Sequence, residues 1–232
     1  MDLHIIFEDQ DIIVCYKPSG IPTQTAKVGA VDMVSLLKNY LYKTQKERRE
    51  PYVAVIHRLD QPVEGILVFA KNPAAAKKLN KGLAESGFGK YYQAVLSRIP
   101  EYETGMLEDY LIKDGRTNTS RVGKPGEKDA KKAVLFYEVL AKSGEQCLVE
   151  VKLDTGRHHQ IRVQMAHMGC PICGDTKYNP EESGHTGWKQ IALCAYKLSV
   201  IHPKTNRKMT FETAPKGEVF QRFQLDKPVK FS

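Results

Sequence analysis

The chain has 232 residues, 41% of them hydrophobic, and its 35 Lys and Arg against 27 Asp and Glu give a net charge of +8. This apolar fraction can bury a core without disulfides or metals, and no apolar run approaches the roughly 18 residues of a membrane span. The five cysteines are an odd number spread along the chain, which fits a reducing compartment better than a disulfide framework. The acidic start carries no secretory signal, so we expect a cytoplasmic protein outside the membrane, with a monomer as the default state.

The first part of the chain is predicted to form strands, one helix and loops. Residues 3–7 and 11–17 are expected strands, and residues 18–22 form the turn after them. Apolar residues at helical spacing predict a helix over 31–42. The charge run at 43–50 is typical of a solvated loop or a frayed helix end rather than of a binding site.

A well-marked loop and helix follow. Two β-prone segments, 52–56 and 65–71, flank a loop at 57–64. Asn72 supplies the N-cap, and the next residue a first-turn proline, for a helix that ends near Gly87.

The second half of the chain is again richer in strands than in helices. The polar and basic stretch 115–129 is expected to be a mobile hairpin or loop, and a helix is expected from Arg157 to about Met168. Further strands are expected over 90–96, 133–140, 146–153, 191–201 and 208–213. The pattern predicts an α+β fold with a mostly antiparallel mixed sheet and flanking helices, in one domain over 1–232.

Asp60 lies in the loop between the two β-prone segments and closes the run His57-Arg58-Leu59-Asp60. Most loop aspartates cap a backbone amide, and the local sequence alone favours that role here. A catalytic role needs a cation that keeps a sheltered carboxylate ionised. Both interpretations stay open at this point.

The segment TGRHHQIR, residues 155–162, offers such a cation. A helix that begins near Arg157 would direct free backbone amides outward, which is a ready phosphate site. Arg162 follows the two histidines by about one turn and would share part of their face. An ordinary ion pair or a solvated arginine is the alternative for Arg162, and the segment does not reveal whether it meets Asp60.

Five segments of the sequence match the motifs of one known family in chain order. They are IIFEDQDIIVCYKPSGIPTQ, HRLDQPVEGILVFAKN, KYYQAV, TGRHHQIRVQMAHMGCPICGDTKY and IALCAYKLSVIHPKTNR. They resemble the opening strand pair, the catalytic HRLD motif, the Lys-x-Tyr-x-Ala motif, the Thr-Gly-Arg-x-His-Gln-Ile-Arg motif and the final hairpin of the RluA-type RNA pseudouridine synthases. Any one motif is weak, but the ordered set covers nearly the whole chain and is specific.

The resemblance implies three catalytic residues. Asp60 corresponds to the invariant aspartate of the family, and Arg162 to the basic residue that pairs with it. Tyr92, rather than Tyr91, corresponds to the active-site tyrosine that stacks on the target base.

Substrate contacts are also implied by the resemblance. Arg58 would help to fill the gap left by the flipped nucleotide, and Ile161 would pack against its sugar or base. The remaining substrate-binding positions are expected at His57, Lys90, Arg157, His158 and Gln160.

Pseudouridine forms when the bond between uracil N1 and the ribose anomeric carbon breaks and the base rejoins through carbon 5. A carboxylate either attacks the anomeric carbon or removes a neighbouring ribose proton, and the sequence leaves both routes open. The target uridine has to be flipped out of its stack. We expect no cofactor. We expect an rRNA or tRNA stem-loop as substrate, since the N-terminal RNA-binding domain of many family members is not expected here.

Two stretches depart from the motifs. Residues 61–64 stand where the family often has a Thr-Ser before the glycine, and Gln164 stands where a histidine is common. The reaction requires neither position, so we expect altered RNA contacts rather than lost activity. The closest alternative is a catalytically inactive RNA-binding protein of the same fold, and the retained Asp60, Tyr92 and Arg162 argue against it.

Cys170 and Cys173 form a CxxC pair with His167 and His185 nearby. A structural zinc site needs four well-spaced ligands, and a zinc deaminase needs a His-x-Glu that the sequence lacks. We therefore expect no metal, and the two cysteines to be small packing residues.

Overall fold

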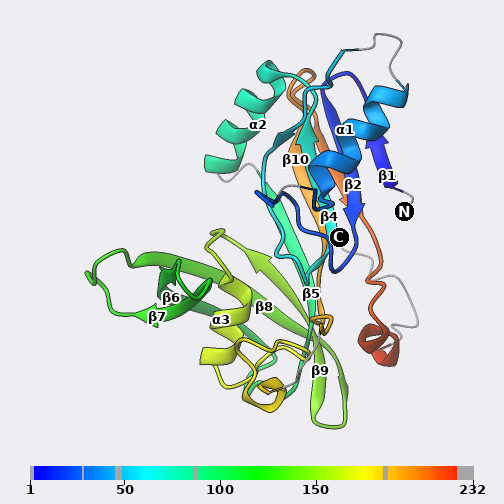
Figure 1. Ribbon diagram of the computed structural model, residues 1–232. Coiled ribbons are helices and arrows are strands. Elements are labelled where there is room, and N and C mark those ends of the chain that lie inside the picture. The colour runs from blue at the N-terminus through cyan, green and yellow to red at the C-terminus, as the bar shows by residue number, and fades with distance from the viewer. Residues whose placement is uncertain (1–2, 28, 45–48, 86–87, 185–187, 224–232) are drawn as a thin grey trace. The chain divides into compact units, whose positions relative to one another are not determined.

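The computed structural model describes residues 3–27, 29–44, 49–85, 88–184 and 188–223 (Figure 1). The chain divides into two compact units. Unit 1 comprises Met1–Lys90 and Ala195–Ala214, and unit 2 comprises Tyr91–Cys194 and Pro215–Ser232. The two boundaries fall inside the strands β5 (Gly89–Leu96) and β10 (Leu193–Ile201).

Unit 1 is built on a sheet with the strand order β1-β2-β4-β10-β11, and β3 pairs with β4. Its further strands span His4–Glu8 (β1), Ile12–Lys17 (β2), Ala54–Val55 (β3), Glu64–Ala70 (β4) and Lys208–Glu212 (β11). β2 and β4 pair antiparallel, and every residue of both strands is buried. Burial on both faces explains why the two strands are mostly continuous apolar runs in the sequence.

The helix α2 (Pro73–Ala84) begins where the sequence predicts. The Asn72 side chain accepts a hydrogen bond from the Ala75 amide at 2.8 Å, and Pro73 stands in the first turn. The apolar face of α2 joins the core formed with the sheet through Ala75, Ala76 and Leu79. The predicted end near Gly87 lies outside the described residues.

The helix α1 (Met33–Thr44) starts two residues later than expected. Asp32 precedes it, and its Oδ1 accepts from the Ser35 amide at 2.7 Å, which caps the first turn. Residues 45–48 of the charge run after α1 lie outside the described residues.

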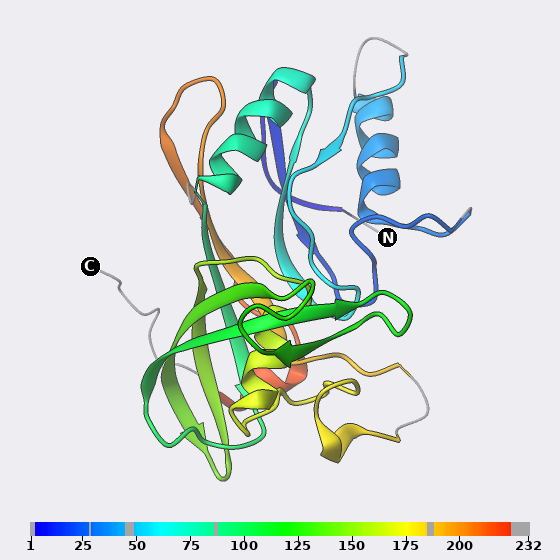
Figure 2. The same cartoon turned by 90° about the vertical axis from the view of Figure 1, so that its left-hand side faces the viewer.

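Unit 2 has the strand order β5-β9-β8-β6-β7. Its other elements span Thr104–Asp114 (β6), Thr119–Gly123 (β7), Lys131–Ser143 (β8), Gln146–Leu153 (β9), Gln160–His167 (α3), Pro180–Glu182 (η1) and Glu218–Phe223 (η2). α3 packs beside β6 and β7 (Figure 2), where Val163 lies in one apolar cluster with Leu111 and Ala133.

The α+β prediction is confirmed. The pairs β6 with β7, β6 with β8, and β8 with β9 are antiparallel, as are β1 with β2 and β10 with β11. None of the described helices is long and apolar enough to cross a membrane.

Local details differ from the predictions. The strand expected over 52–56 is only Ala54–Val55. The stretch 115–129, expected to be a hairpin or a loop, contains β7, which forms a hairpin with β6. β6 has no counterpart among the predicted strands, because acidic residues interrupt its apolar ones and its residues alternate between exposed and half-buried over much of its length. α3 begins at Gln160 rather than near Arg157, since the residue before it has left-handed backbone with φ 53°.

Candidate active site

The loop that carries Asp60 joins β3 to β4 in unit 1. The Thr23 hydroxyl donates to the Leu59 carbonyl at 3.0 Å and accepts from the Leu59 amide at 3.1 Å. On the other side of Asp60, the Gln61 carbonyl accepts from the Gly20 amide, and the Gln61 side chain donates to the Gly20 carbonyl, both at 2.9 Å. Asp60 therefore lies between two residues whose backbone is held in place.

His57 fastens the start of this loop to β4. Its Nε2 accepts from the Val68 amide at 3.3 Å, and its ring meets the Phe88 ring edge-on, with 6.1 Å between centroids. Burial and the nearby Lys90 charge lower the pKa of His57 to about 3, so the ring is neutral near pH 7. His57 has a positional role in the loop, and its contact with RNA stays a prediction.

Lys17, the last residue of β2, is a buried cation that the motif analysis did not single out. Its side chain is fully buried, and its Nζ donates to the carbonyls of Pro18 at 3.0 Å, Ile21 at 2.7 Å and Gln61 at 3.1 Å. An ammonium group has three N–H donors, and these three acceptors use all of them. Lys17 thereby ties the turn after β2 to the Asp60 loop.

Opposing effects set the charge of Lys17. Burial lowers its pKa, while the carboxylates of Asp60 and Glu64 raise it, and the outcome is about 7 against an ordinary 10.5. Asp60 thus has a cation within its own unit that the sequence analysis did not provide. The one signal for it is a lysine that ends an apolar strand just before the Pro-Ser-Gly turn.

Arg162 of α3 is a buried cation in unit 2. It is 4% exposed and binds Asp175 with two hydrogen bonds, Nε to Oδ2 and one terminal nitrogen to Oδ1, both 2.8 Å. The guanidinium carbon lies 5.1 Å from the centre of the Tyr178 ring. The structural ion pair considered for Arg162 is therefore present, with Asp175, and its pairing with Asp60 stays a prediction. Asp175 and Tyr178 were not predicted from the sequence, although both lie in the GDTKY end of a matched motif.

The two histidines before α3 belong to one hydrogen-bonded network. His159 is 7% exposed, and its Nδ1 lies 2.7 Å from the Tyr178 hydroxyl, which accepts from the Ser120 amide at 2.7 Å. Burial, followed by the Arg162 charge, lowers the pKa of His159 to about 2, so the ring is neutral near pH 7. His158 stacks on His159 with 3.8 Å between ring centroids and lies 2.9 Å from the Ser120 hydroxyl.

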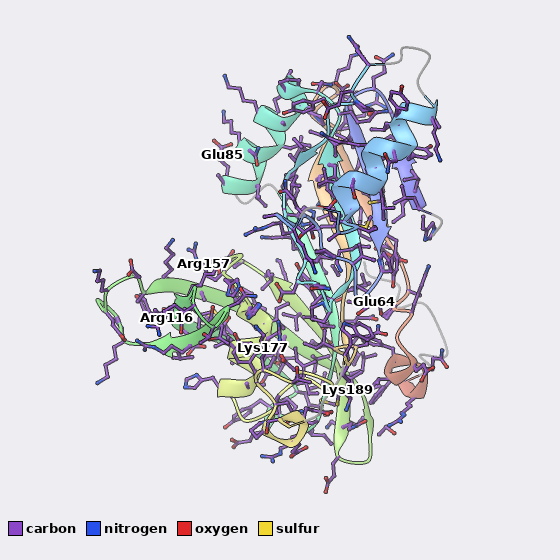
Figure 3. All side chains as sticks on the ribbon, viewed as in Figure 1. Glu64, Glu85, Arg116, Arg157, Lys177 and Lys189 are labelled. Atoms are coloured by element: carbon purple, nitrogen blue, oxygen red, sulfur yellow. The ribbon has the colours of Figure 1, made fainter. Side chains whose placement is uncertain are left out.

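Gln160 closes the turn into α3 from inside the chain. Its Oε1 accepts from the Thr155 hydroxyl at 2.8 Å and the Arg157 amide at 2.9 Å, and its Nε2 donates to the Val134 carbonyl at 3.0 Å. The Arg157 amide is therefore already bonded within the chain, and phosphate binding at this turn stays a prediction. The Arg157 side chain is exposed, and its Nε donates to the Lys132 carbonyl at 2.8 Å (Figure 3).

The remaining predicted site residues differ in exposure. Tyr92 on β5 is 7% exposed, and Ile161 on α3 is 4% exposed. Arg58 is exposed on the Asp60 loop, and Lys90 is half-buried at the start of β5. Their roles around a flipped nucleotide stay predictions.

Cys170 and Cys173 are free, buried thiols. Burial raises the pKa of both, that of Cys173 to about 11. His167 contacts Asp109 instead, with 3.0 Å between Nδ1 and Oδ1, and His185 lies outside the described residues. These surroundings suit packing residues better than reactive thiolates.

One set of His and acidic side chains in the described part of the chain lies close enough to share a cation: Asp9, Asp11 and His202. The two ring nitrogens of His202 are already used, by Asp9 Oδ2 at 2.8 Å and by the Thr205 amide at 3.1 Å. This cluster is a hydrogen-bonded anchor of the loop between β10 and β11.

Comparison with known proteins gives a consistent result. The family model described as RNA pseudouridylate synthase matches residues 11–167. The tRNA pseudouridine synthase C of Vibrio parahaemolyticus is 29% identical over 245 residues, which covers 97% of both proteins. The ribosomal large subunit pseudouridine synthase D of Pseudomonas aeruginosa is 33% identical over 224 residues, which covers 92% of this chain and 68% of that protein.

The fold has a solved counterpart. The structure of human RNA pseudouridylate synthase domain containing 4 matches with a TM-score of 0.78 at 22% identity, and the match covers 97% of this chain and 94% of that one. At this level of identity the match shows the fold.

Proposed function

The chain belongs to the RNA pseudouridylate synthase family and is an isomerase of RNA, and from that premise we propose that Asp60 is the carboxylate that isomerises uridines in structured tRNA or rRNA. The observation that supports this assignment best is the Asp60 loop itself. Hydrogen bonds fix its backbone on both sides of Asp60, and the buried Lys17 lies close enough for the two charges to interact. A turn residue that only caps an amide has no need of a buried cation.

The proposed roles of the other site residues follow the family motif. Asp60 attacks the anomeric carbon of the flipped uridine or removes a neighbouring ribose proton, in either case as an ionised carboxylate. Arg162 pairs with it, and Tyr92 stacks on the detached uracil while the base turns. Uracil leaves as a stabilised anion, so a second carboxyl group is not required as an acid.

The proposed substrate is a stem-loop that presents the uridine for flipping. One of the similar proteins is named for tRNA and the other for the large ribosomal subunit, which supports both RNA classes. Flipping costs a few kcal/mol, and contacts of basic residues such as Lys90 and Arg157 with phosphates offset it. We further propose that the protein works as a monomer, in one catalytic domain, in the cytoplasm.

The proposal is tested by tritium release from RNA labelled with [5-³H]uridine, using total RNA from cells that lack the protein. We expect release by the wild type without added metal and in the presence of a chelator, and none by Asp60→Asn. Asp11→Asn is the matched control, since it makes the same substitution at another loop aspartate of unit 1. The carboxylate of Asp11 accepts a hydrogen bond from the Asn72 side chain. Turnover in Asp60→Asn at the wild-type rate would remove Asp60 from the mechanism. A wild type that binds this RNA but releases no tritium would instead favour the inactive RNA-binding protein.

A further inference from the structure

Asp175 lies in the loop between α3 and η1 and holds the Arg162 guanidinium by one edge. The Nε and Nη2 atoms of Arg162 donate to different oxygens of the Asp175 carboxylate, both at 2.8 Å. Both side chains are buried. A guanidinium group is planar, so two parallel hydrogen bonds to one carboxylate fix the direction of its plane as well as its place.

The Asp175 carboxylate is itself held by the backbone of its loop. Its Oδ1 also accepts from the amides of Lys177 at 3.0 Å and Tyr178 at 3.3 Å (Figure 3). The preceding Gly174 has φ 77°, and a Cβ there would lie 2.2 Å from the Gln190 carbonyl oxygen, so only glycine fits this turn. The carboxylate is therefore anchored by contacts other than the guanidinium that it binds.

Tyr178 lies against the guanidinium as well. The centre of its ring is 5.1 Å from the guanidinium carbon of Arg162. The ring is anchored in turn, because its hydroxyl accepts from the Ser120 amide and is hydrogen-bonded to His159 Nδ1, both at 2.7 Å. Carboxylate and ring together leave the guanidinium little freedom to turn.

Stability alone does not explain this arrangement, because apolar residues of similar volume often stabilise a fold as well as a buried ion pair does. Building on the proposed function, in which Arg162 belongs to the catalytic set, we propose that Asp175 is a positioning residue for pseudouridine formation: its carboxylate holds one edge of the Arg162 guanidinium, so that the other edge keeps a single orientation during the reaction. Asp175 acts through Arg162 and does not contact the substrate.

Two substitutions separate orientation from charge. In Asp175→Asn the two backbone amides keep Oδ1, so an NH2 group replaces the oxygen that faces Nε of Arg162. Asp175→Glu keeps the negative charge but moves the carboxylate by the length of one methylene group. Asp175→Glu carries the test alone if Asp175→Asn does not fold.

The single-turnover rate of tritium release from the same [5-³H]uridine-labelled total RNA is measured against enzyme concentration. Both variants should lower the maximal rate by about 10- to 100-fold, because a displacement of about 1 Å at a catalytic group can cost that much. The half-saturating enzyme concentration should stay that of the wild type, since Asp175 does not touch the RNA. A wild-type maximal rate in Asp175→Glu, or a change confined to the half-saturating concentration, overturns the proposal.

Asp109→Asn is the matched control, because the Asp109 carboxylate of β6 also binds α3, through Gln164 Nε2 at 2.8 Å and His167 Nδ1 at 3.0 Å. Its maximal rate should equal that of the wild type. A loss of rate in Asp109→Asn as large as that in Asp175→Asn would trace the effect to the packing of α3 and would overturn the positioning role.

Arg162→Lys adds a readout that a merely structural role would not move. Lysine keeps the charge but cannot form two parallel hydrogen bonds with a carboxylate. If Asp175 acts through Arg162, Asp175→Glu should leave the maximal rate of Arg162→Lys unchanged, since the same interaction is lost only once. Losses that multiply in the double variant overturn the proposal.

A measurement on the free protein separates this proposal from the proposed function. Rotation of the Arg162 guanidinium about its Nε–Cζ bond is followed from the ¹⁵Nη signals in the wild type and in Asp175→Glu. Rotation should be about tenfold slower in the wild type, where both hydrogen bonds must break first. Equal rotation rates overturn the proposal even where pseudouridine is formed. A wild type that forms no pseudouridine contradicts the proposed function, whereas the rotation rates still show whether Asp175 fixes the guanidinium.

Discussion

The two units stabilise a buried cation in different ways. In unit 2, Arg162 is neutralised by Asp175 through two 2.8 Å hydrogen bonds, and a guanidinium group keeps its charge at any pH that a protein tolerates. In unit 1, Lys17 donates to three neutral carbonyls, and its pKa is about 7. One cation is therefore permanent, and the charge of the other depends on pH.

Because only one of the two cations changes its charge near pH 7, the two units should respond differently to pH. The turn into α3 depends on a permanent ion pair and on His159, which stays neutral above its pKa of about 2. Its geometry should be constant from pH 6 to pH 9. The Asp60 loop depends on Lys17 over the same interval, so the pH sensitivity of stability and rate should arise in unit 1.

The largest effect is expected when the Arg162 ion pair is broken. Asp175→Asn leaves a buried guanidinium without its carboxylate, and loss of one partner of such a pair costs about 3–5 kcal/mol of unfolding free energy. Urea unfolding at pH 6.5 and pH 9 should give the same loss, because the guanidinium keeps its charge at both pH values. Glu181→Gln is the control, since it breaks an exposed arginine pair of the same unit (Arg98 62% and Glu181 55% exposed) and should cost less than about 1 kcal/mol. Equal losses of unfolding free energy in the two variants would show that the buried Arg162 pair stabilises the protein no more than an exposed pair does.

A smaller and pH-dependent effect is expected at Lys17. Its folded pKa of about 7 lies below the ordinary 10.5, so between these values the unfolded chain binds more protons than the folded one. Wild-type stability therefore gains a contribution as pH rises through that window. A methionine side chain cannot titrate, so the stability deficit of Lys17→Met relative to the wild type should grow by a few kcal/mol between pH 6.5 and pH 9.

The Lys17 prediction is measured by urea unfolding at the two pH values. Lys38→Met is the control, because Lys38 pairs with Glu50 at the surface, at 2.6 Å, and its difference from the wild type should be nearly constant. A deficit of Lys17→Met that is the same at pH 6.5 and pH 9 would contradict a pH-dependent charge in unit 1.

The fold was predictable from sequence wherever one physical signal dominated. The apolar runs of β2 and β4 and the Asn72 cap of α2 gave the correct element type, with boundaries within two residues where the structure describes them. β6 was missed because pairing with β7 and β8 forms this strand, while its sequence mixes Glu108 and Asp109 with apolar residues. Tertiary pairing of this kind leaves no local pattern.

The candidate site was predictable only as a set of motif positions. Lys17 was missed because lysine is normally exposed, and its burial depends on the carbonyl of Gln61, 44 positions further along the chain. The RNA contact expected of Gln160 stays a prediction, and the hydrogen bonds by which its buried side chain closes the turn into α3 were not predicted. Motif matches identify positions, while the hydrogen-bond partners of each side chain come from the folded chain.

The smallest of the three effects is expected at Tyr178 in unit 2. Tyr178→Phe keeps the ring that lies over Arg162, with 5.1 Å to its centre. It removes the hydroxyl that accepts from the Ser120 amide and is hydrogen-bonded to His159 Nδ1. Leaving buried polar groups without their partner costs about 1–3 kcal/mol.

Urea unfolding of Tyr178→Phe should show this cost equally at pH 6.5 and pH 9, because His159 is neutral at both. Tyr102→Phe is the matched control, since Tyr102 is 67% exposed and its variant should unfold like the wild type. A Tyr178→Phe loss that changed between the two pH values would mean that a group of unit 2 titrates in this range. The contrast between a pH-sensitive loop in unit 1 and a pH-insensitive turn in unit 2 would then fail.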